Sequence, residues 1–548
     1  MHKSSGQRRE RGANLAERFS REKRPAGEFL DAMRHEVAPR STGHQRSEGP
    51  SRSPGGAVLG LPIFDVLPSS PAGRLVLSLL SRVLELAPQS GFYAAMAEAA
   101  RLLRGDRGLH SRQRRFVGDA LHSCVRLLRR LRRLASLSAN PALRQPSPLQ
   151  LYLVWLCEGS TTDDEAIVAP LLPLLTAQGL GATALQAARR QLAQNFRDSA
   201  QAERSAIDDS ARLAELVEAV GDALSYPSWL VRCVLASFGS DGAGRQQTLS
   251  ILAAQNERAP LCVRVNRLRG SRQDAMPRLE AEGLIPHPTP LASDGLYLDG
   301  HENVYATATF ADGWIELQDE GSQLIAELVS PPPGGVVIDA CAGAGGKTLA
   351  LGALLGNRGR LLALDVDRRK LEELSRRTRR AGLTNVQALC LPDDWTQDGG
   401  ATRLPGWLQQ AGADRVLVDA PCSGLGVLRR NPEARWRLGP SDIDELCATQ
   451  SRLLQGAASL VRPHGRLIYS TCTVLRRENE NIVQAFLQHN PTFSLVPVKE
   501  IFGLARAAGC SDPDGQFLRT LPTPGGPDGF FAAVLRRRSE DAPSAKQP

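Results

Sequence analysis

The sequence lacks the cysteine and histidine spacings that hold zinc or form a disulfide framework. Its ten cysteines include no CxxC pair, and none is grouped with histidine at zinc-ligand spacing. These absences argue against a structural zinc site and against a disulfide-stapled secreted fold. We therefore expect a protein of the reducing cytoplasm that binds no metal.

Long apolar runs are missing as well. No uninterrupted apolar stretch is long enough to cross a bilayer. The first twelve residues, MHKSSGQRRERG, are charged where a signal peptide would be apolar. No internal repeat is evident. The sequence thus predicts a soluble protein with no membrane partner.

The chain is long and has the amino-acid composition of an ordinary globular protein. It has 548 residues, 42% of them hydrophobic and 23% charged, so two or three domains are expected. The formal net charge is +9 and the pI is near 9.2. That balance favours a polyanionic partner such as nucleic acid, although many soluble proteins share it.

The amino-terminal part divides into an arm and a helical region. Residues 1–56 are rich in Arg, Glu, Ser, Gly and Pro and have no helical or strand period, which predicts a disordered basic arm. Residues 74–222 repeat an amphipathic helical pattern. Within residues 115–134 one apolar stripe comprises Phe116, Val117, Ala120, Leu121, Cys124, Leu128 and Leu131. The other face carries arginines at 126, 129, 130, 132 and 133, for which RNA contact and a solvated face are equally good interpretations.

The remaining chain changes to an α/β pattern. Pro227, in Ser225-Tyr-Pro-Ser-Trp229, ends the helical run, and residues 223–330 are predicted to form a linker and a small α/β unit. From 331 to 537 strands alternate with helices, which is typical of a doubly wound parallel sheet, and residues 538–548 form a tail. The clearest predicted strands are 336–339, 361–365, 416–419, 467–471 and 530–535.

A glycine-rich turn follows the first of these strands. In Asp339-Ala-Cys-Ala-Gly-Ala-Gly-Gly-Lys-Thr348 the glycines permit a sharp turn, and the helix that follows offers free N–H groups at its start. A nucleotide-triphosphate loop is excluded, because only two residues separate Gly343 from the Gly346-Lys347 pair instead of four. The turn predicts a cofactor cradle.

Acidic residues at the next strand ends fit a nucleoside cofactor. Asp365 lies 22 positions after Gly343, where it is placed to accept hydrogen bonds from two ribose hydroxyls. A helix cap is the alternative interpretation of Asp365. Asp393 and Asp394 close a further strand where adenine is commonly contacted, and the sequence does not choose between them.

Two more strand ends each carry a cysteine. Cys422 follows Asp419-Ala-Pro, and Cys472 follows Tyr469-Ser-Thr. A lone cysteine is most often a small buried hydrophobe. Because the carboxyl ends of parallel strands share one edge of the sheet, both thiols are expected to face the crevice of the cofactor.

With these residues the sequence resembles the RsmB-like and Sun-type RNA cytosine-C5 methyltransferases, over about residues 75–537. Further matching segments are 225–229, 264–267, 312–314, 318–319, 426–430, 431–433, Trp436 and 478–479. The resemblance implies a Rossmann-like methyltransferase domain preceded by an all-α NusB-like domain. It also implies that RNA is the partner and S-adenosylmethionine the cofactor, with 16S ribosomal RNA as the substrate. We expect a monomer, although the sequence itself does not give the oligomeric state.

The resemblance also assigns roles to single residues. Cys472 would be the nucleophile that adds to carbon 6 of cytosine, Cys422 would assist product release, and Asp419 would contact the ring. The cofactor contacts would be Cys341, Ala342, Gly343, Ala344, Gly345, Gly346, Lys347, Asp365, Lys370, Asp393 and Asp419. One departure is Ala344, which replaces the proline of the family's usual CAAPGGK, and Gly343 beside it makes the loop more flexible than usual. The target base would be extruded or single-stranded, with Arg429, Arg430 and Trp436 as candidate contacts and a structural role as the alternative for Trp436.

Three other functions stay open at this point. The same chemistry could act on transfer RNA or another RNA, and the protein could be a non-catalytic RNA-binding or ribosome-assembly factor. A DNA cytosine methyltransferase is disfavoured. In the DNA enzymes the cysteine that follows a proline, here Cys422, attacks the cytosine, and Cys472 would have no role.

Overall fold

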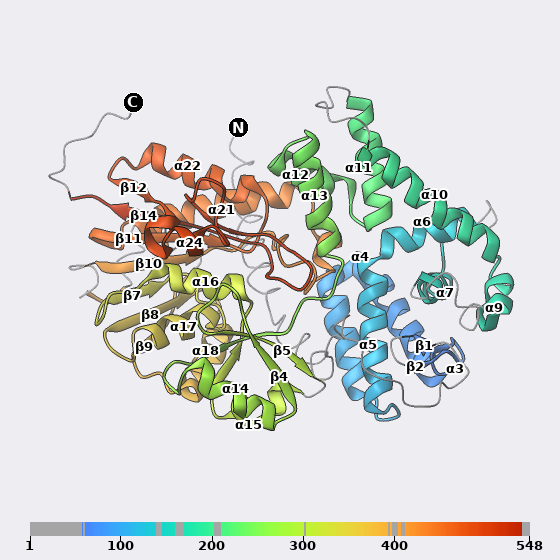
Figure 1. Cartoon of the computed structure of the whole chain (residues 1–548), viewed down its shortest axis with the longest axis horizontal. Helices are drawn as coiled ribbons and strands as arrows, with labels where there is room; N and C mark the ends of the chain where they lie inside the picture. The colour runs from blue at the N-terminus through green and yellow to red at the C-terminus, as the bar shows by residue number, and fades with distance from the viewer. Residues whose placement is uncertain are drawn as a thin grey trace, which may run out of the picture. The chain divides into compact units, whose positions relative to one another are not determined.

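The computed structural model describes residues 57–58, 61–138, 145–158, 169–201, 210–300, 303–392, 395–396, 404–406 and 412–539. The predicted arm at 1–56, the residues after 539, and both Asp393 and Asp394 lie outside these ranges. The chain forms two compact units (Figure 1). Residues 258–427 and 438–539 belong to an α/β unit, and the described residues up to 257, with 428–437, belong to a helical unit.

The helical unit contains long amphipathic helices around one apolar core. Its elements are β1 Ala57–Val58, β2 Leu61–Pro62, α3 Ile63–Val66, α4 Pro71–Gly105, α5 Ser111–Arg126, α6 Leu128–Ser138, α7 Pro148–Glu158, η1 Ala169–Leu171, α9 Leu172–Ala177, α10 Ala182–Gln201, α11 Ser210–Leu224, α12 Ser228–Phe238, α13 Gly242–Ala254 and α20 Ala434–Arg437. All seven residues of the predicted apolar stripe are buried in this core. An all-helical region therefore precedes the α/β part, as the sequence predicts.

Two details of the helical unit differ from the sequence expectation. The helix predicted over 115–134 breaks at Leu127, because the backbone N–H of Arg129 donates to the Ser225 hydroxyl at 3.0 Å instead of continuing α5. The segment around Pro227 ends α11, but it is buried: Tyr226 is fully enclosed, and its hydroxyl donates to the carbonyl of Leu252 at 2.9 Å. Helices α12 and α13 follow directly, so this proline marks a bend inside the helical unit.

A small antiparallel sheet opens the α/β unit. Its strands lie in the order β4, β5, β3, β6, with α14 connecting β3 to β4. The elements are β3 Cys262–Val265, α14 Arg272–Ala281, β4 Leu284–Pro288, β5 Gly295–Gly300, η2 Val304–Ala306, α15 Ala308–Ala311 and β6 Ile315–Leu317.

The main sheet has eight strands in the order β12, β14, β11, β10, β7, β8, β9, with β13 also paired to β14. Strands β7 to β11 run parallel, and β14 is antiparallel to β11. The elements are α16 Glu320–Val329, β7 Val336–Asp339, α17 Gly346–Leu354, β8 Arg360–Asp365, α18 Arg368–Ala381, β9 Val386–Cys390, β10 Ala413–Asp419, α21 Pro440–Ala458, β11 Val461–Thr471, η4 Arg476–Glu478, α22 Glu480–His489, β12 Phe493–Val496, α23 Val498–Phe502, α24 Leu504–Ala507, β13 Leu518–Thr520 and β14 Phe530–Arg537. This is the predicted doubly wound Rossmann-like fold.

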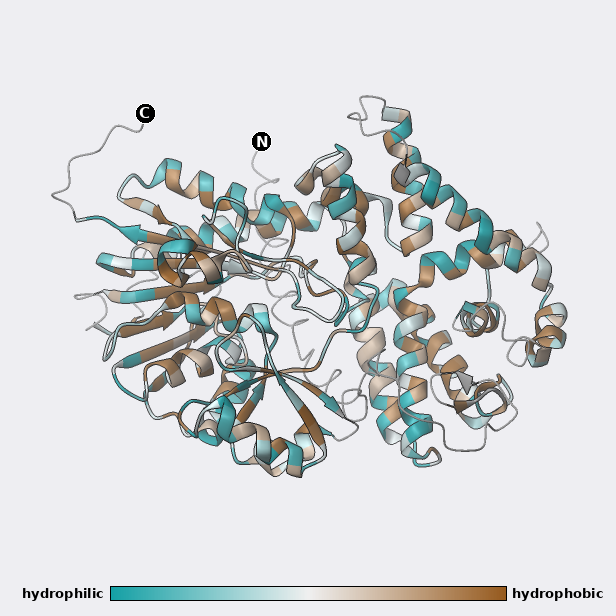
Figure 2. Ribbon diagram, viewed as in Figure 1, coloured by the Kyte–Doolittle hydropathy of each residue, from teal (hydrophilic) through white to brown (hydrophobic). Residues whose placement is uncertain are grey.

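Alternate residues of the strands pack on opposite faces of this sheet. Ile338 and Val416 join a core with residues of α21 and α22, whereas Val337 and Leu417 join a core with residues of α16 and α17. The central strands β7, β8 and β10 are accordingly mostly apolar, as is usual for parallel strands covered on both faces, and Figure 2 shows brown stretches along the ribbons of the sheet. The chain moves from β7 to β8 and β9 on one side and to β10 and β11 on the other. The carboxyl end of β7 therefore lies at the switch point, where α/β sheets bind ligands.

Candidate active site

The predicted glycine-rich turn lies at this switch point, between β7 and α17. Gly343 and Gly345 have φ of 55° and 90°, a region that a residue with a side chain adopts at a cost. A Cβ on Gly345 would lie 2.8 Å from Cγ of Leu374, whereas a Cβ on Gly343 would meet no atom within 4 Å. Glycine at 345 thus lets the turn pack on α18, and the turn is open at Gly343.

Asp365, at the end of β8, is hydrogen-bonded to this turn. Its Oδ2 accepts from the N–H of Gly343 at 2.8 Å, and its Oδ1 accepts from the N–H of Asp367, also at 2.8 Å. Each carboxylate oxygen keeps a further lone pair, and the side chain is partly exposed. The helix cap of α18 is Asp367, so capping does not account for Asp365. The two acceptor oxygens fit a ribose with two free hydroxyls.

The turn is also held by an arginine of α18. Arg377 donates from Nη1 to the carbonyl of Ala344 at 2.8 Å and from Nη2 to Glu316 of β6 at 3.0 Å. Arg380 also pairs with Glu316. Burial would raise the pKa of Glu316, but the charges and hydrogen bonds of Arg377 and Arg380 outweigh it and hold that pKa below its usual value. The carbonyl of Ala344 is therefore fixed by an ion-paired arginine.

Lys347 and Asp419 meet across the strand ends. Lys347 lies in the first turn of α17, and its Nζ is 2.9 Å from Oδ2 of Asp419 at the end of β10. Oδ1 of Asp419 accepts from the Ser470 hydroxyl at 3.0 Å. The ammonium group is nearly buried, whereas Asp419 is about one-third exposed. The carboxylate of Asp419 is thus oriented by two donors and remains open to a further ligand.

Asp339, the last residue of β7, is a buried acid that the sequence did not single out. It accepts from the Thr348 hydroxyl at 2.7 Å, and its Oδ1 has no hydrogen-bond partner among the described residues. Burial raises the pKa of Asp339 to about 7, and the neighbouring carboxylates of Asp419 and Asp365 add to the rise.

The two cysteines lie together. The Sγ atoms of Cys422 and Cys472 are 3.4 Å apart, and the backbone N–H of Cys472 approaches the Cys422 sulfur at the same distance. Cys422 is 3% exposed, while Cys472 is partly exposed. The expectation that both thiols reach one edge of the sheet is met, and Cys472 is the more accessible.

Glycine allows the loop after Cys422 to run this close to Cys472. The N–H of Gly426 donates to the carbonyl of Cys472 at 2.9 Å, and the N–H of Gly529 donates to the carbonyl of Gly426 at 2.9 Å. A Cβ on Gly426 would lie 2.0 Å from the carbonyl oxygen of Gly529 and 2.8 Å from that of Cys472. Any side chain at 426 would force these backbones apart.

The remaining predicted residues lie around this site or outside the described ranges. Cys341 and Ala342 begin the turn, and the N–H of Ala342 donates to the carbonyl of Leu364. Lys370 lies in the first turn of α18, with its Nζ 3.9 Å from Asp367. Asp393 is among the residues that the structure does not describe.

Several arginines proposed for RNA contact have protein partners. Arg129 pairs with Glu218 and Asp222, and Arg130 pairs with Glu158. Trp436 donates its indole N–H to the carbonyl of Val125 at 2.7 Å within the helical unit. Of its two interpretations the structure thus supports a structural role for Trp436.

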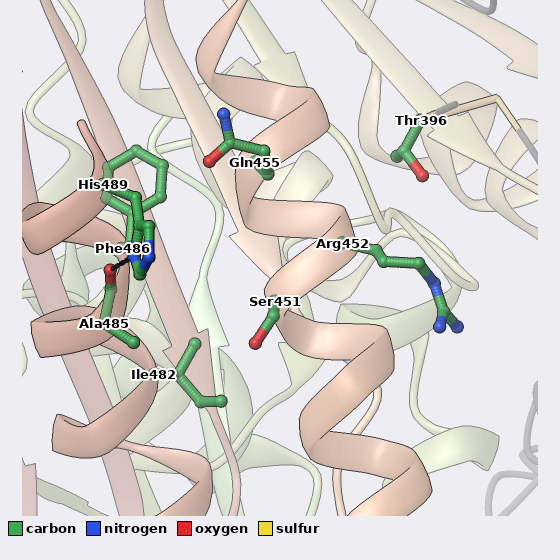
Figure 3. A pocket seen from close by; sticks show the side chains of 8 residues that line it. All are labelled: Thr396, Ser451, Arg452, Gln455, Ile482, Ala485, Phe486 and His489. Atoms are coloured by element: carbon green, nitrogen blue, oxygen red, sulfur yellow. Dashed lines mark hydrogen bonds between the residues drawn. The ribbon is translucent and has the colours of Figure 1, made fainter. Parts of the chain in front are cut away.

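Two open pockets lie away from the cysteines. The first, of about 430 Å³, lies between α21 and α22 (Figure 3), where His489 Nδ1 is 2.7 Å from the carbonyl of Ala485. Its lining is Thr396, Ser451, Arg452, Gln455, Ile482, Ala485, Phe486 and His489. The second, of about 440 Å³, is on the small sheet, where Arg267 faces Asp294. Neither contains a predicted site residue.

Among the described residues, no three His, Cys, Asp or Glu side chains are grouped so that they could hold a metal ion. Over the same ranges, no helix combines the length and apolarity that a membrane crossing requires.

A parallel sheet with a glycine turn at its switch point and an acidic residue ending the next strand is the architecture of α/β proteins that bind nucleoside cofactors. One solved structure, of a protein designated PH0851, has the same fold. It superposes with a TM-score of 0.62 over 86% of this chain and 99% of that one, at 24% identity.

The sequence comparisons give the family. Residues 326–536 match the family described as 16S rRNA methyltransferase RsmB/F, and residues 226–305 match the ferredoxin-like domain of RsmF/B-like methyltransferases. Ribosomal RNA small subunit methyltransferase B of Xanthomonas campestris pv. campestris is 34% identical over 321 residues, which are 59% of this chain and 68% of that protein. The protein of that name in Vibrio cholerae is 32% identical over 57% of this chain and 65% of its own length. This chain belongs to the RsmB/F methyltransferase family.

Proposed function

We propose that this protein transfers a methyl group from S-adenosylmethionine to carbon 5 of a cytosine in RNA, with 16S ribosomal RNA as the substrate. The observation that carries the proposal is the pair of thiols 3.4 Å apart. They follow the neighbouring parallel strands β10 and β11, at the same edge of the sheet as the glycine turn after β7. The names of the relatives, which are small-subunit ribosomal RNA methyltransferases, support ribosomal RNA as the substrate class.

The geometry of the turn supports a cofactor role for its residues and for Asp365, and the family resemblance adds Lys370 and Asp393. Asp365 would accept hydrogen bonds from the ribose hydroxyls, and residues 341–347 would line the cofactor, with Lys370 and Asp393 as further contacts. When bound, S-adenosylmethionine supplies an electrophilic methyl group on a sulfonium. The ion pair of Lys347 with Asp419 lies on the same edge of the sheet as this turn.

The chemistry requires a covalent step, because carbon 5 of cytosine is a weak nucleophile. The Cys472 thiolate would add to carbon 6, forming an S–C bond as the C5=C6 double bond opens and giving carbon 5 enamine character. Carbon 5 could then take the methyl group, with S-adenosylhomocysteine as the leaving group. Asp419 would hydrogen-bond the ring edge and stabilise the charge of the adduct. Carbon 5 then loses its proton, and the S–C bond breaks to expel the Cys472 thiolate.

The division of roles between the thiols rests on accessibility and on the family resemblance. Cys472 is the more exposed residue of the two, as a nucleophile that must reach a base requires. Cys422 is buried, with its sulfur 3.4 Å from that of Cys472, a position suited to assisting the elimination of the carbon-5 proton.

The roles are tested with cysteine-to-serine variants, 16S ribosomal RNA, transfer RNA and labelled cofactor. Cys472→Ser should form neither product nor covalent adduct, because its hydroxyl is a much weaker nucleophile. Cys422→Ser should accumulate a covalent complex with RNA that is visible on a denaturing gel. Cys447→Ser, which changes a partly exposed cysteine of α21, is the control and should behave like wild type.

Two results would overturn parts of the proposal. The reverse pattern of adducts would exchange the two roles, and methylation of transfer RNA with none of 16S ribosomal RNA would show that the substrate is wrong.

A further inference from the structure

Two consecutive buried residues hydrogen-bond to both cysteine loops, and neither of them has a role in the chemistry described above. Glu478 ends η4 and Asn479 precedes α22. Glu478 is fully buried, and Asn479 is 2% exposed. We refer to Glu478 and Asn479 together as the clamp.

Glu478 holds the loop of Cys422. Its Oε1 accepts from the backbone N–H of Ser423, the residue after Cys422, at 2.8 Å, and its Oε2 accepts from the Ser423 hydroxyl at 2.5 Å. Gln450 of α21 donates to Oε1 at 3.0 Å and also to the carbonyl of Pro421, the residue before Cys422. Residues on both sides of Cys422 are therefore connected to one carboxyl group.

Asn479 holds the loop of Cys472 in the same way. Its Oδ1 accepts from the Thr471 hydroxyl at 2.6 Å, and its Nδ2 donates to the carbonyl of Thr473 at 3.0 Å. These are the residues immediately before and after Cys472. One amide side chain thus fixes the backbone on both sides of that thiol.

The clamp is itself anchored, and the two loops are connected directly. The Tyr469 hydroxyl donates to the carbonyl of Glu478 at 2.6 Å, which ties the clamp to β11. The hydroxyls of Ser423 and Thr473 lie 2.9 Å apart. Every side-chain oxygen and nitrogen atom of Glu478 and Asn479 is hydrogen-bonded, and buried polar groups that are satisfied in this way favour one arrangement of the groups that they connect.

We propose that Glu478 and Asn479 are positioning residues that hold the two thiols in contact. The proposal rests on the proposed function for its catalytic meaning, but the geometry it describes is separate from turnover. Neither side chain touches the reacting atoms. Each acts through the residues that flank a cysteine, and displacement of a reacting group by about 1 Å can cost about a hundredfold in rate.

The first test measures how fast the two thiols form a disulfide, without RNA or cofactor. Diamide takes two hydrogen atoms from the two thiols and is reduced to the hydrazine, while an S–S bond forms between Cys422 and Cys472. The disulfide is quantified by peptide mass spectrometry over time. In Glu478→Gln, whose NH₂ group cannot accept from Ser423, and in Asn479→Ala, the rate should fall by at least about tenfold.

The second test uses steady-state methylation of 16S ribosomal RNA. Both variants should lose at least about tenfold in kcat, while KM for RNA and the affinity for S-adenosylhomocysteine stay at wild-type values. A defect of general stability would change binding and thermal melting as well. The matched control is Glu480→Gln, because Glu480 is a buried glutamate of α22 that pairs with Arg519 of β13.

The outcomes separate the two proposals. Folded Glu478→Gln and Asn479→Ala proteins with a wild-type disulfide rate, or with a wild-type kcat, would overturn the clamp, as would an equal loss in Glu480→Gln. If the wild-type protein methylates no RNA, the proposed function fails, and the disulfide rates still decide whether the clamp positions the thiols.

Discussion

At the residue scale, Asp339 links the site to pH. Its pKa of about 7 compares with an ordinary value of 3.8, so between these values the folded protein keeps a proton that the unfolded chain has lost. Stability that depends on this proton is present below pH 4 and is lost as the pH rises to 7. The slope from this one group is at most about 1.4 kcal/mol per pH unit.

The expected result concerns Asp339→Asn, which keeps an acceptor for Thr348 and cannot ionise. The free energy of unfolding of wild type, measured with urea, should fall relative to that of Asp339→Asn as the pH rises from 5 to 7. Asp514→Asn, at an exposed position, should track wild type. Parallel pH profiles for wild type and Asp339→Asn would contradict this account.

Single residues also mark what the sequence could and could not predict. The convergence of Cys422 and Cys472 follows from their positions at two strand ends, because parallel strands end at one edge. The roles of Glu478 and Asn479 do not follow from sequence, since acid and amide residues before a helix usually serve as caps. Their partners lie up to 55 positions away, and only the folded loops bring them together.

At the scale of elements, the cofactor turn depends on α18 and β6. A turn with Ala344 instead of proline loses a restriction on its backbone, and the hydrogen bond from Arg377 supplies one from outside the turn. The sequence predicted the flexibility of this loop, but it could not predict this restraint, because β6 was not among the predicted strands and Glu316 was not recognised as buried.

Arg377→Ala should therefore weaken binding of S-adenosylhomocysteine by about tenfold to a hundredfold, which corresponds to a charged hydrogen bond of about 1.5–3 kcal/mol. Isothermal titration calorimetry measures this affinity without RNA. Arg379→Ala, an exposed position two residues along the same helix, should bind as wild type does. Unchanged affinity in Arg377→Ala would mean that the turn does not need the hydrogen bond from Arg377 to bind the cofactor.

At the scale of the whole molecule, the chain leaves the α/β unit shortly after Cys422. Residues 428–437 pack within the helical unit, and the chain re-enters the α/β unit at Leu438. Arg435 is fully buried there: its guanidinium is 4.1 Å from the centre of the Tyr226 ring, and it donates to Asn256 and to the carbonyl of Ser225. The sequence predicted base contacts at Arg429, Arg430 and Trp436 and did not single out Arg435. The partners of Arg435 lie about 200 positions away in sequence, so no local pattern reveals its buried role.

Arg435→Ala should destabilise the protein by about 3–5 kcal/mol, because it leaves buried acceptors without their donor. Limited proteolysis should then cut within 428–437, and chemical unfolding should begin at lower denaturant. Arg232→Ala, exposed on α12 of the same unit, provides the comparison and should change little. An Arg435→Ala protein as protease-resistant as wild type would exclude Arg435 as the anchor of this segment.

The crossing of backbones at Gly426 and Gly529 has a consequence for how variants of this family are interpreted. Neither glycine carries a functional group, yet the contact between them runs directly against the carbonyl of Cys472. A survey of natural variants that scores only cysteines, acids and cofactor contacts would classify a change at either position as harmless. In this protein the absence of a side chain is itself part of the candidate active site, and it should be inherited as strictly as the thiols.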